Sequence, residues 1–243
     1  MDYKSKIILI AGPTASGKSK IAINLAKKIN GEIINADSMQ VYKQLKILTA
    51  RPSEKDQKTI KHHLFGIIDV RKRFSTGQWL KKCIKIINLI RKKNKTPIIV
   101  GGTGLYFKAL VDGLVSIPKF EPSEKNKILK LHKKLGQKQF YKKLVKLDPV
   151  SKKFINSNDV NRSIRAYEVK KLTKKSLYKW FKDTKTFFDK DDFVMTYVDR
   201  PRDKLIINIK NRIDRMFDLG AIKQDKKLNL IKICLLYTTP RTR

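Results

Sequence analysis

The sequence predicts an α/β protein of the P-loop type, with a doubly wound, mostly parallel sheet and a small helical insertion domain. In the N-terminal half, short continuous apolar runs alternate with amphipathic helical segments, a pattern typical of strands buried on both faces. A glycine-rich segment, GPTASGKS at 12–19, directly follows the first run. Residues 117–192 lose the strand pattern and become rich in lysine. We therefore predict a core formed by 1–116 and 193–243, with the helical insertion at 117–192.

The expected strands are short segments dominated by apolar residues and bounded by turn residues. They are residues 6–11, 32–36, 64–69, 98–100 and 193–198. The expected helices have apolar residues at helical spacing. Their apolar stripes are Ile21, Ala22, Leu25 and Ile29; Trp79, Cys83, Ile86, Ile87 and Ile90; Phe140, Tyr141, Leu144 and Val145; and Leu205, Ile206, Ile209, Ile213, Met216 and Phe217.

The charge of the chain is strongly positive. The 57 Lys and Arg residues against 21 Asp and Glu give a formal net charge of +36. This excess favours a polyanionic partner, with nucleic acid ahead of a membrane surface. The two cysteines, Cys83 and Cys234, lie far apart without a metal-type spacing, and no apolar run reaches membrane length. We expect a soluble, cytoplasmic and monomeric protein.

The segment 12–19 has the spacing of a phosphate-binding loop. Glycines let the backbone approach a phosphate closely, and the helix that follows adds the positive end of its dipole. Lys18 is expected to reach the outer phosphate, and the Ser19 hydroxyl to bind Mg²⁺. The nucleotide- or diphosphate-binding residues are then Gly12, Pro13, Thr14, Ala15, Ser16, Gly17, Lys18 and Ser19.

Two polar residues follow other strands of the predicted sheet. Ligands of doubly wound sheets bind beyond the carboxyl ends of the strands, so Asp37 and Thr103 are expected in the same crevice as the phosphate loop. Asp37 would otherwise be a turn or N-cap residue; in the crevice it could accept a proton or hold Mg²⁺ through water. The strand at 98–100 ends in Gly-Gly-Thr and not in Asp, which argues against an ordinary ATPase.

Basic residues stand out in two further helices. Asn158 or Asp159 is expected to cap a helix whose Arg162 and Arg165 share one face, with Val160, Ile164 and Tyr167 opposite. From this spacing alone, a solvated arginine face is as good an explanation as a binding site. Arg212 flanks the apolar stripe of its helix whereas Asp214 lies on the other side, so Arg212 is expected to meet neighbouring structure or a bound anion.

Several motifs in order resemble the tRNA dimethylallyltransferase (tRNA isopentenyltransferase) family. They are GPTASGKS at 12–19, NADSMQVYK at 35–43, TARPS at 49–53, HHLFGIIDV at 62–70, FSTGQW at 74–79, IIVGGTGLYFKAL at 98–110 and LDPVSKKFINSNDVNRSIRAYEV at 147–169. The Arg212 helix ending at Gly220 matches more weakly. After Gly220 neither the Gly-Tyr-x-Glu element nor the late basic-aromatic helix of the family is found, so we expect a C-terminal part that is truncated or altered.

The resemblance implies transfer of a dimethylallyl group from dimethylallyl diphosphate to the N6 amine of the adenosine 3′-adjacent to the anticodon in certain tRNAs. It implies Mg²⁺ as cofactor and the anticodon arm as partner. Asp37 would be the general base, Arg212 the second clamp on the diphosphate, and Thr103 a further active-site residue. Residues implied to contact tRNA are Asp37, Ser38, Met39, Gln40, Thr103, Lys125, Asn161, Arg162, Ser163, Ile164 and Arg165.

Three other functions stay open at the level of sequence. A P-loop kinase for a small metabolite would share the phosphate loop, but would not explain the DSMQVY and GGTGLY segments together. An RNA-binding protein without activity would fit the altered C-terminal part. A prenyltransferase acting on free adenine nucleotides would not need the large lysine-rich insertion.

Overall fold

The computed structural model describes residues 3, 5–182 and 184–229. The described part of the chain divides into two compact units, one formed by residues within 1–111 and 187–243 and the other by residues within 112–186. The first unit contains β1 (Ile7–Ala11), α1 (Lys18–Lys28), β2 (Gly31–Asn35), α2 (Glu54–Thr59), β3 (His62–His63), α3 (Thr76–Arg91), β4 (Thr96–Gly101), α4 (Gly104–Val111), the 3-10 turn η2 (Lys190–Asp192), β5 (Phe193–Tyr197), α8 (Arg202–Asp218) and α9 (Ala221–Asn229).

The sheet of this unit has the strand order β3-β2-β4-β1-β5, and each strand pair is parallel. The predicted α/β class is therefore confirmed, and β1, β2, β4 and β5 lie where strands are expected. The prediction of a third strand at residues 64–69 is wrong. The strand is His62–His63 instead, because Leu64 adopts a φ of 64° and ends the extended run; Ile68 then forms one isolated bridge with Tyr42.

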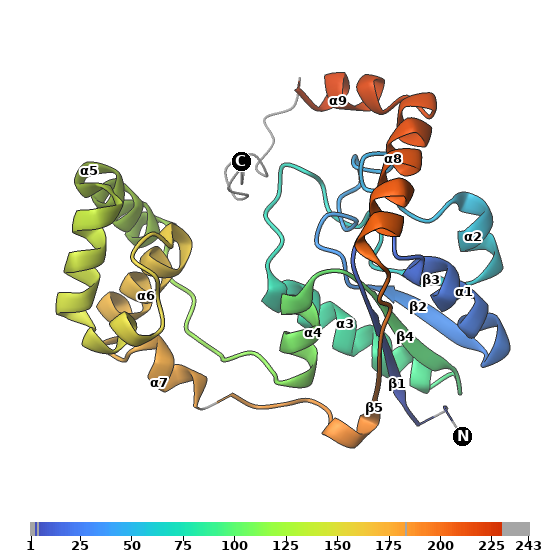
Figure 1. The fold of residues 1–243 in the computed structure, drawn as a ribbon. Helices are drawn as coiled ribbons and strands as arrows, with labels where there is room; N and C mark the ends of the chain where they lie inside the picture. Colours follow the sequence, from blue (N-terminus) through green and yellow to red (C-terminus); the bar gives the residue numbers. More distant parts are fainter. Residues whose placement is uncertain (1–2, 4, 183, 230–243) are drawn as a thin grey trace. The chain divides into compact units, whose positions relative to one another are not determined.

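Helices cover both faces of the sheet (Figure 1). Alternate residues of each strand point to opposite faces, so Ile7 and Leu9 pack with α3 and α4 whereas Ile8 and Ile10 pack with α1. Capping boxes at Ser53 and Ser75 begin the helices α2 and α3. The Trp79 indole of α3 donates to the Asn35 carbonyl at 2.8 Å, which joins this helix to the end of β2.

α8 departs from expectation in its packing. Its expected apolar stripe is split, and none of its residues is fully buried. Leu205, Ile209 and Met216 are half-buried, whereas Ile206 and Phe217 are 46% and 55% exposed. The side of α8 that includes Met216 lines a pocket, whereas Ile206 and Phe217 are not among the residues that line it.

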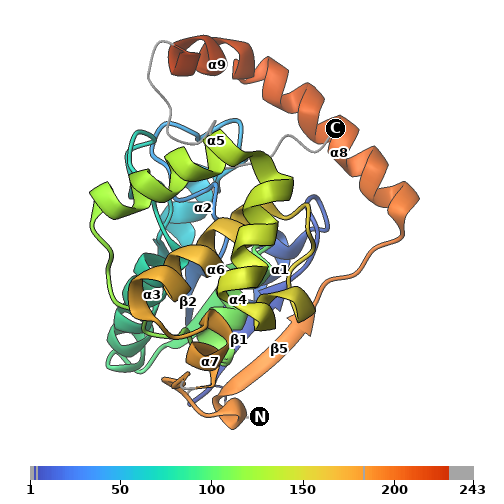
Figure 2. The same ribbon diagram turned by 90° about the vertical axis from the view of Figure 1, so that its left-hand side faces the viewer.

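The second unit is helical in all its described elements, of which the α-helices are labelled in Figures 1 and 2. The elements are α5 (Pro122–Leu147), the 3-10 turn η1 (Pro149–Lys153), α6 (Val160–Thr173) and α7 (Leu177–Phe181). α5 bends at Gly136, whose φ of 70° lies outside helical geometry. The unit has its own apolar core, which includes Phe140, Leu144 and Tyr167. Val160, expected to face this core, is 37% exposed.

Across the described residues, no helix combines the length and the apolar character needed to cross a membrane.

Candidate active site

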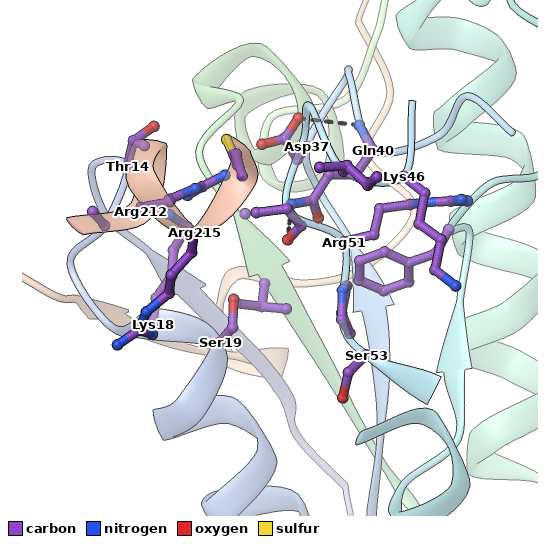
Figure 3. A pocket seen from close by; sticks show the side chains of 18 of the residues that line it. Thr14, Lys18, Ser19, Asp37, Gln40, Lys46, Arg51, Ser53, Arg212 and Arg215 are labelled. Atoms are coloured by element: carbon purple, nitrogen blue, oxygen red, sulfur yellow. Dashed lines mark hydrogen bonds between the residues drawn. The ribbon is translucent and has the colours of Figure 1, made fainter. Parts of the chain in front are cut away.

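A pocket of about 810 Å³ lies at the carboxyl edge of the sheet in the first unit. Its walls come from the phosphate loop, the turn after β2, the segment 46–54, the end of β4 and α8. Of the site residues expected from sequence, those that line it are Thr14, Ala15, Gly17, Lys18, Ser19, Asp37, Gln40 and Arg212. Figure 3 shows Lys18, Arg212 and Arg215 along one side, with Asp37, Gln40 and Arg51 along the other.

The backbone conformation of the phosphate loop requires glycine at two positions, Gly12 and Gly17. A Cβ on Gly12 would lie 2.7 Å from the Val198 carbonyl oxygen, so only glycine fits against the end of β5. Gly17 has a φ of 90° and stands at the N-terminus of α1, a left-handed conformation that glycine adopts without strain. α8 supports the loop because Asn208 donates to the Ala15 carbonyl at 3.1 Å. The loop is thus held open toward the pocket at a helix N-terminus, where anions bind.

Lys18 and Arg212 are the cations next to this loop. Lys18 Nζ donates to the Pro13 carbonyl at 2.9 Å. Burial lowers the pKa of Lys18; the nearby carboxylate of Asp37 opposes this shift and the charge of Arg212 adds to it. Burial also lowers the pKa of Arg212, again opposed by Asp37. Two half-buried cations that repel one another favour an anion between them.

Asp37 faces these cations from the turn after β2. The turn is fixed by the side chain of Asn35. Its Nδ2 donates to the Asp37 carbonyl, and its Oδ1 accepts from the Asp37 backbone N–H, both at 2.9 Å. Asp37 Oδ1 accepts from the Met39 amide at 2.8 Å and more weakly from Gln40 at 3.4 Å; the Gln40 contact is the dashed line in Figure 3. Oδ2 has no hydrogen-bond partner among the described residues, so it can accept a proton.

Other expected site residues support the pocket from outside its lining. The Thr103 hydroxyl accepts from the Ser38 amide at 3.0 Å, and the Thr103 amide donates to the Ala36 carbonyl at 3.1 Å. Ser16 is buried, and its hydroxyl lacks a hydrogen-bond partner among the described residues. The two Thr103 hydrogen bonds tie the segment after β4 to the turn after β2.

Three pocket cations were not expected from sequence: Lys46, Arg51 and Arg215. Arg215 lies one helical turn beyond Arg212, so the i, i+3 spacing could have found it. Arg51 belongs to the TARPS segment; its guanidinium donates to the Lys43 carbonyl at 3.0 Å, and burial lowers its pKa. Lys46 pairs with Glu54 at 2.7 Å. The segment that carries Arg51 and Lys46 has little regular structure, so no periodicity predicts where its side chains point.

The expected tRNA-contacting residues of the second unit differ in exposure. Asp159 caps α6 by accepting from the Arg162 amide at 2.9 Å, which decides between the two expected caps. Asn161 and Arg162 are exposed, and Lys125, Ile164 and Arg165 are half-buried. Arg165 contacts Glu168 at 3.3 Å and lies over the Phe120 ring. Ser163 is fully buried and within 3.2 Å of the Gln137 amide nitrogen, so its side chain is not on the surface.

Metal ligands are sparse in this pocket. Among the described residues, no group of three or more His, Cys, Asp or Glu side chains could hold a metal ion. The Ser19 hydroxyl and the Asp37 carboxylate nevertheless line the same pocket. Mg²⁺ is commonly held by few protein oxygens together with water and substrate phosphates, and this oxygen set is compatible with that mode.

Comparison with known proteins gives consistent matches along the chain. The family model for IPP transferases matches residues 40–236, and so extends past Gly220. The tRNA dimethylallyltransferase of Pelagibacter ubique (strain HTCC1062) is 56% identical over 233 residues, which is 96% of this chain and 74% of that protein. The tRNA dimethylallyltransferase of Caulobacter sp. (strain K31) is 40% identical over 220 residues, covering 90% of this chain and 71% of the relative.

Solved structures give the same picture. A eukaryotic dimethylallyltransferase acting on tRNA superposes with a TM-score of 0.79 at 31% identity, covering 92% of this chain and 56% of that one. The tRNA isopentenylpyrophosphate transferase of Bacillus halodurans superposes with a TM-score of 0.63 at 33% identity, covering 95% and 72%. The chain therefore spans about three quarters of its bacterial relatives and little more than half of the eukaryotic one.

Proposed function

This chain belongs to the tRNA dimethylallyltransferase family, and on that premise we propose that it transfers a dimethylallyl group to the N6 amine of the adenosine 3′-adjacent to the anticodon. The donor is dimethylallyl diphosphate, and diphosphate is released. The observation that carries the proposal is the placement of Asp37 in one pocket with Lys18 and Arg212. A carboxylate with one unused oxygen stands beside an anion cradle, which is what alkyl transfer from a diphosphate requires.

The cradle binds the donor. Backbone amides of Thr14–Ser19, the Lys18 ammonium and the Arg212 guanidinium hold the diphosphate and stabilise its charge as the C1–O bond breaks. Mg²⁺ would be held by Ser19 and the diphosphate oxygens, and when bound it neutralises part of the leaving group's charge. Ile33, Phe65 and Val100 line the same pocket and exclude water from the allylic carbon.

Asp37 acts as the general base for the acceptor, the adenine N6 amine. The adenine amine is a weak nucleophile because its lone pair is delocalised into the ring, and it becomes acidic as the new N6–C1 bond forms. Asp37 Oδ2 then takes the proton, so the products are the alkylated adenosine, diphosphate and one proton on the carboxylate. The base must leave its stack to enter the pocket, and the turn from Asp37 to Gln40 would receive it.

The second unit is proposed to bind the anticodon arm of the tRNA. Lys125, Asn161, Arg162 and Arg165 would carry that contact, with the net charge of +36 attracting the polyanion over a longer range. Binding should therefore weaken steeply with salt. We further propose that the enzyme acts as a monomer in the cytoplasm.

A transfer assay tests the proposal directly. The full chain is incubated with Mg²⁺, radiolabelled dimethylallyl diphosphate and unmodified tRNA, and label is followed into RNA. We expect label in tRNA, and an Asp37→Asn variant that binds donor normally but transfers at least about 100-fold more slowly. Label in free AMP, or phosphate transfer from ATP alone, would contradict the proposal. Binding of tRNA without any turnover would favour an RNA-binding protein without activity.

A further inference from the structure

Three aromatic side chains form a continuous group on the second unit. Phe154, which follows η1, stacks on Tyr178 of α7 with ring centroids 4.2 Å apart and an interplanar angle of 22°. Tyr178 meets Phe181 edge to face at 5.8 Å. Phe154 is 56% and Phe181 50% exposed. We call Phe154, Tyr178 and Phe181 the aromatic cluster.

A buried carboxylate holds the two segments that carry this cluster. Asp148 is 2% exposed, and its Oδ2 accepts from the Ser151 hydroxyl at 3.0 Å and from the Ser176 hydroxyl at 2.8 Å. Ser151 belongs to η1, directly before Phe154, and Ser176 caps α7 by accepting from the Tyr178 amide. The rings are thus presented on a fixed backbone framework, which reduces the entropy lost when a ligand stacks on them.

Positive charge surrounds the aromatic cluster. Lys152 and Lys153 precede Phe154, and Lys179 and Lys182 flank the α7 rings; all four are exposed. Arg162, whose side chain is 73% exposed, is also close by. Burial raises the pKa of Tyr178, as do the charges of Asp148 and Asp159, whereas Arg162 opposes them.

The two carboxylates near the aromatic cluster, Asp148 and Asp159, already have hydrogen-bond or ion-pair partners within the protein. Asp148 is buried and bonded to the two serines. Asp159 caps α6 and pairs with Arg162 at 3.4 Å. The surface therefore offers aromatic faces together with surplus cations. Unpaired nucleotides match this chemistry because each has a flat ring for stacking and a phosphate for the cations.

We propose that the aromatic cluster stacks an unpaired nucleobase of the RNA substrate while Arg162 and the neighbouring lysines hold the flanking phosphates. The inference rests on the proposed function, since it deepens the role of the second unit in RNA binding. It goes further by assigning a base-stacking site, made of rings outside the pocket, which recognises loop RNA by its unstacked bases and not by its charge alone.

The test is a titration of the full chain with two fluorescent RNAs, a hairpin with an unpaired loop and a blunt duplex with the same number of phosphates. We expect Phe154→Leu and Phe181→Leu each to weaken hairpin binding by about fivefold or more and to leave duplex binding unchanged. Phe181→Trp should keep wild-type affinity because it retains a stacking face. Phe187→Leu is the matched control, since Phe187 is an equally exposed phenylalanine (57%) outside the cluster.

Salt dependence separates stacking from charge. Phe181→Leu should leave the slope of log affinity against log salt unchanged, whereas Arg162→Ala should reduce its magnitude by about one. Thermal unfolding of each variant identifies any loss that comes from misfolding, and Phe181 is the safer site because its only ring contact among the described residues is edge-on.

The outcomes distinguish the inference from the proposed function. If the wild type binds hairpin and duplex equally, or if the two leucine variants bind hairpin like the wild type, the stacking site is wrong while tRNA transfer stands. If the wild type binds and modifies no tRNA, the proposed function fails. Tighter binding of the cluster to acidic peptides or anionic vesicles than to the hairpin would also overturn the inference.

Discussion

The Thr103 hydroxyl accepts a 3.0 Å hydrogen bond from the Ser38 amide, which ties the segment after β4 to the turn that carries Asp37. Replacing Thr103 by Val removes the acceptor while keeping the shape of the side chain. We expect transfer to slow by about 10- to 100-fold because the base is no longer held in place. Single-turnover rates measure this, and Thr103→Ser, which keeps the hydroxyl, should stay close to wild type. Equal losses in both variants would mean that the hydroxyl does not position Asp37.

Arg212 and Lys210 offer a matched pair on one helix. Arg212 lines the pocket and donates to the Thr49 carbonyl at 3.1 Å, whereas Lys210 is exposed. We expect Arg212→Ala to lower kcat/KM for dimethylallyl diphosphate by about 100-fold or more, because a charge contact to the leaving group is lost. Lys210→Ala should leave this parameter unchanged. A similar decrease in both variants would show that only the general charge of α8 matters.

The sequence predicts those parts of the candidate site that depend on motif spacing, strand ends and helical periodicity. The spacing of 12–19 indicates the phosphate loop, and the ends of parallel strands bring Asp37 to it. Arg212 follows from helical periodicity. The segment between β2 and α3 was not predictable in the same way, because its path is set by single contacts such as Tyr42 with Ile68. For this reason the sequence pattern predicts a strand at 64–69 where the structure has β3 at His62–His63, and it does not indicate that Arg51 and Lys46 line the pocket.

α8 illustrates a different limit. An apolar stripe predicts that one side of a helix is covered, but not by what. Here the partly covered side lines a pocket and carries Arg212 and Arg215, whereas Ile206 and Phe217 stay exposed. The altered C-terminal part expected after Gly220 extends into residues 230–243, which lie outside the described residues, as does Cys234.

The pH dependence of donor binding should report on Lys18. Burial lowers the pKa of this ammonium, and the diphosphate binds its protonated form. As pH rises through the lowered pKa the cation is lost, so kcat/KM for dimethylallyl diphosphate should fall at a lower pH than an ordinary lysine would allow. Lys18→Arg keeps the charge and should lose this alkaline decline, with a lower rate throughout. The same decline in Lys18→Arg would assign it to another group.

Stability toward acid should depend on Glu32. This carboxylate is buried on β2 and is bonded by His63 at 2.7 Å and Lys95 at 3.1 Å. Burial alone raises the pKa of Glu32, but the two hydrogen-bonded partners bring it below its usual value. Because the pKa is lowered on folding, this stabilisation is present above the unfolded-state pKa and is lost as pH falls through the folded-state pKa.

Glu32→Gln should therefore destabilise the protein at neutral pH and reduce the dependence of stability on acid pH. Breaking a buried pair costs about 3 kcal/mol or more, and the partial exposure of Lys95 reduces this to about 2 kcal/mol. Denaturant unfolding at neutral and acid pH measures both effects. Glu54→Gln, at an exposed pair with Lys46, should leave the unfolding midpoint nearly unchanged. An unchanged acid limb in Glu32→Gln would assign the pH dependence to other carboxylates.

Gly101 and Gly102 are adjacent in sequence but differ in the space that a side chain would have. A Cβ on Gly101 would lie 2.2 Å from the carbonyl carbon and oxygen of Ala36, whereas on Gly102 the nearest atom is the Gly12 oxygen at 3.5 Å. The Ala36 backbone leads directly into Asp37, so Gly101→Ala should push β2 away and destabilise the fold by about 3 kcal/mol. Gly102→Ala makes only an ordinary contact and should change stability by less than about 0.5 kcal/mol. Thermal unfolding of the two variants measures the difference, and equal stabilities would show that β2 and β4 can separate at their carboxyl ends without cost.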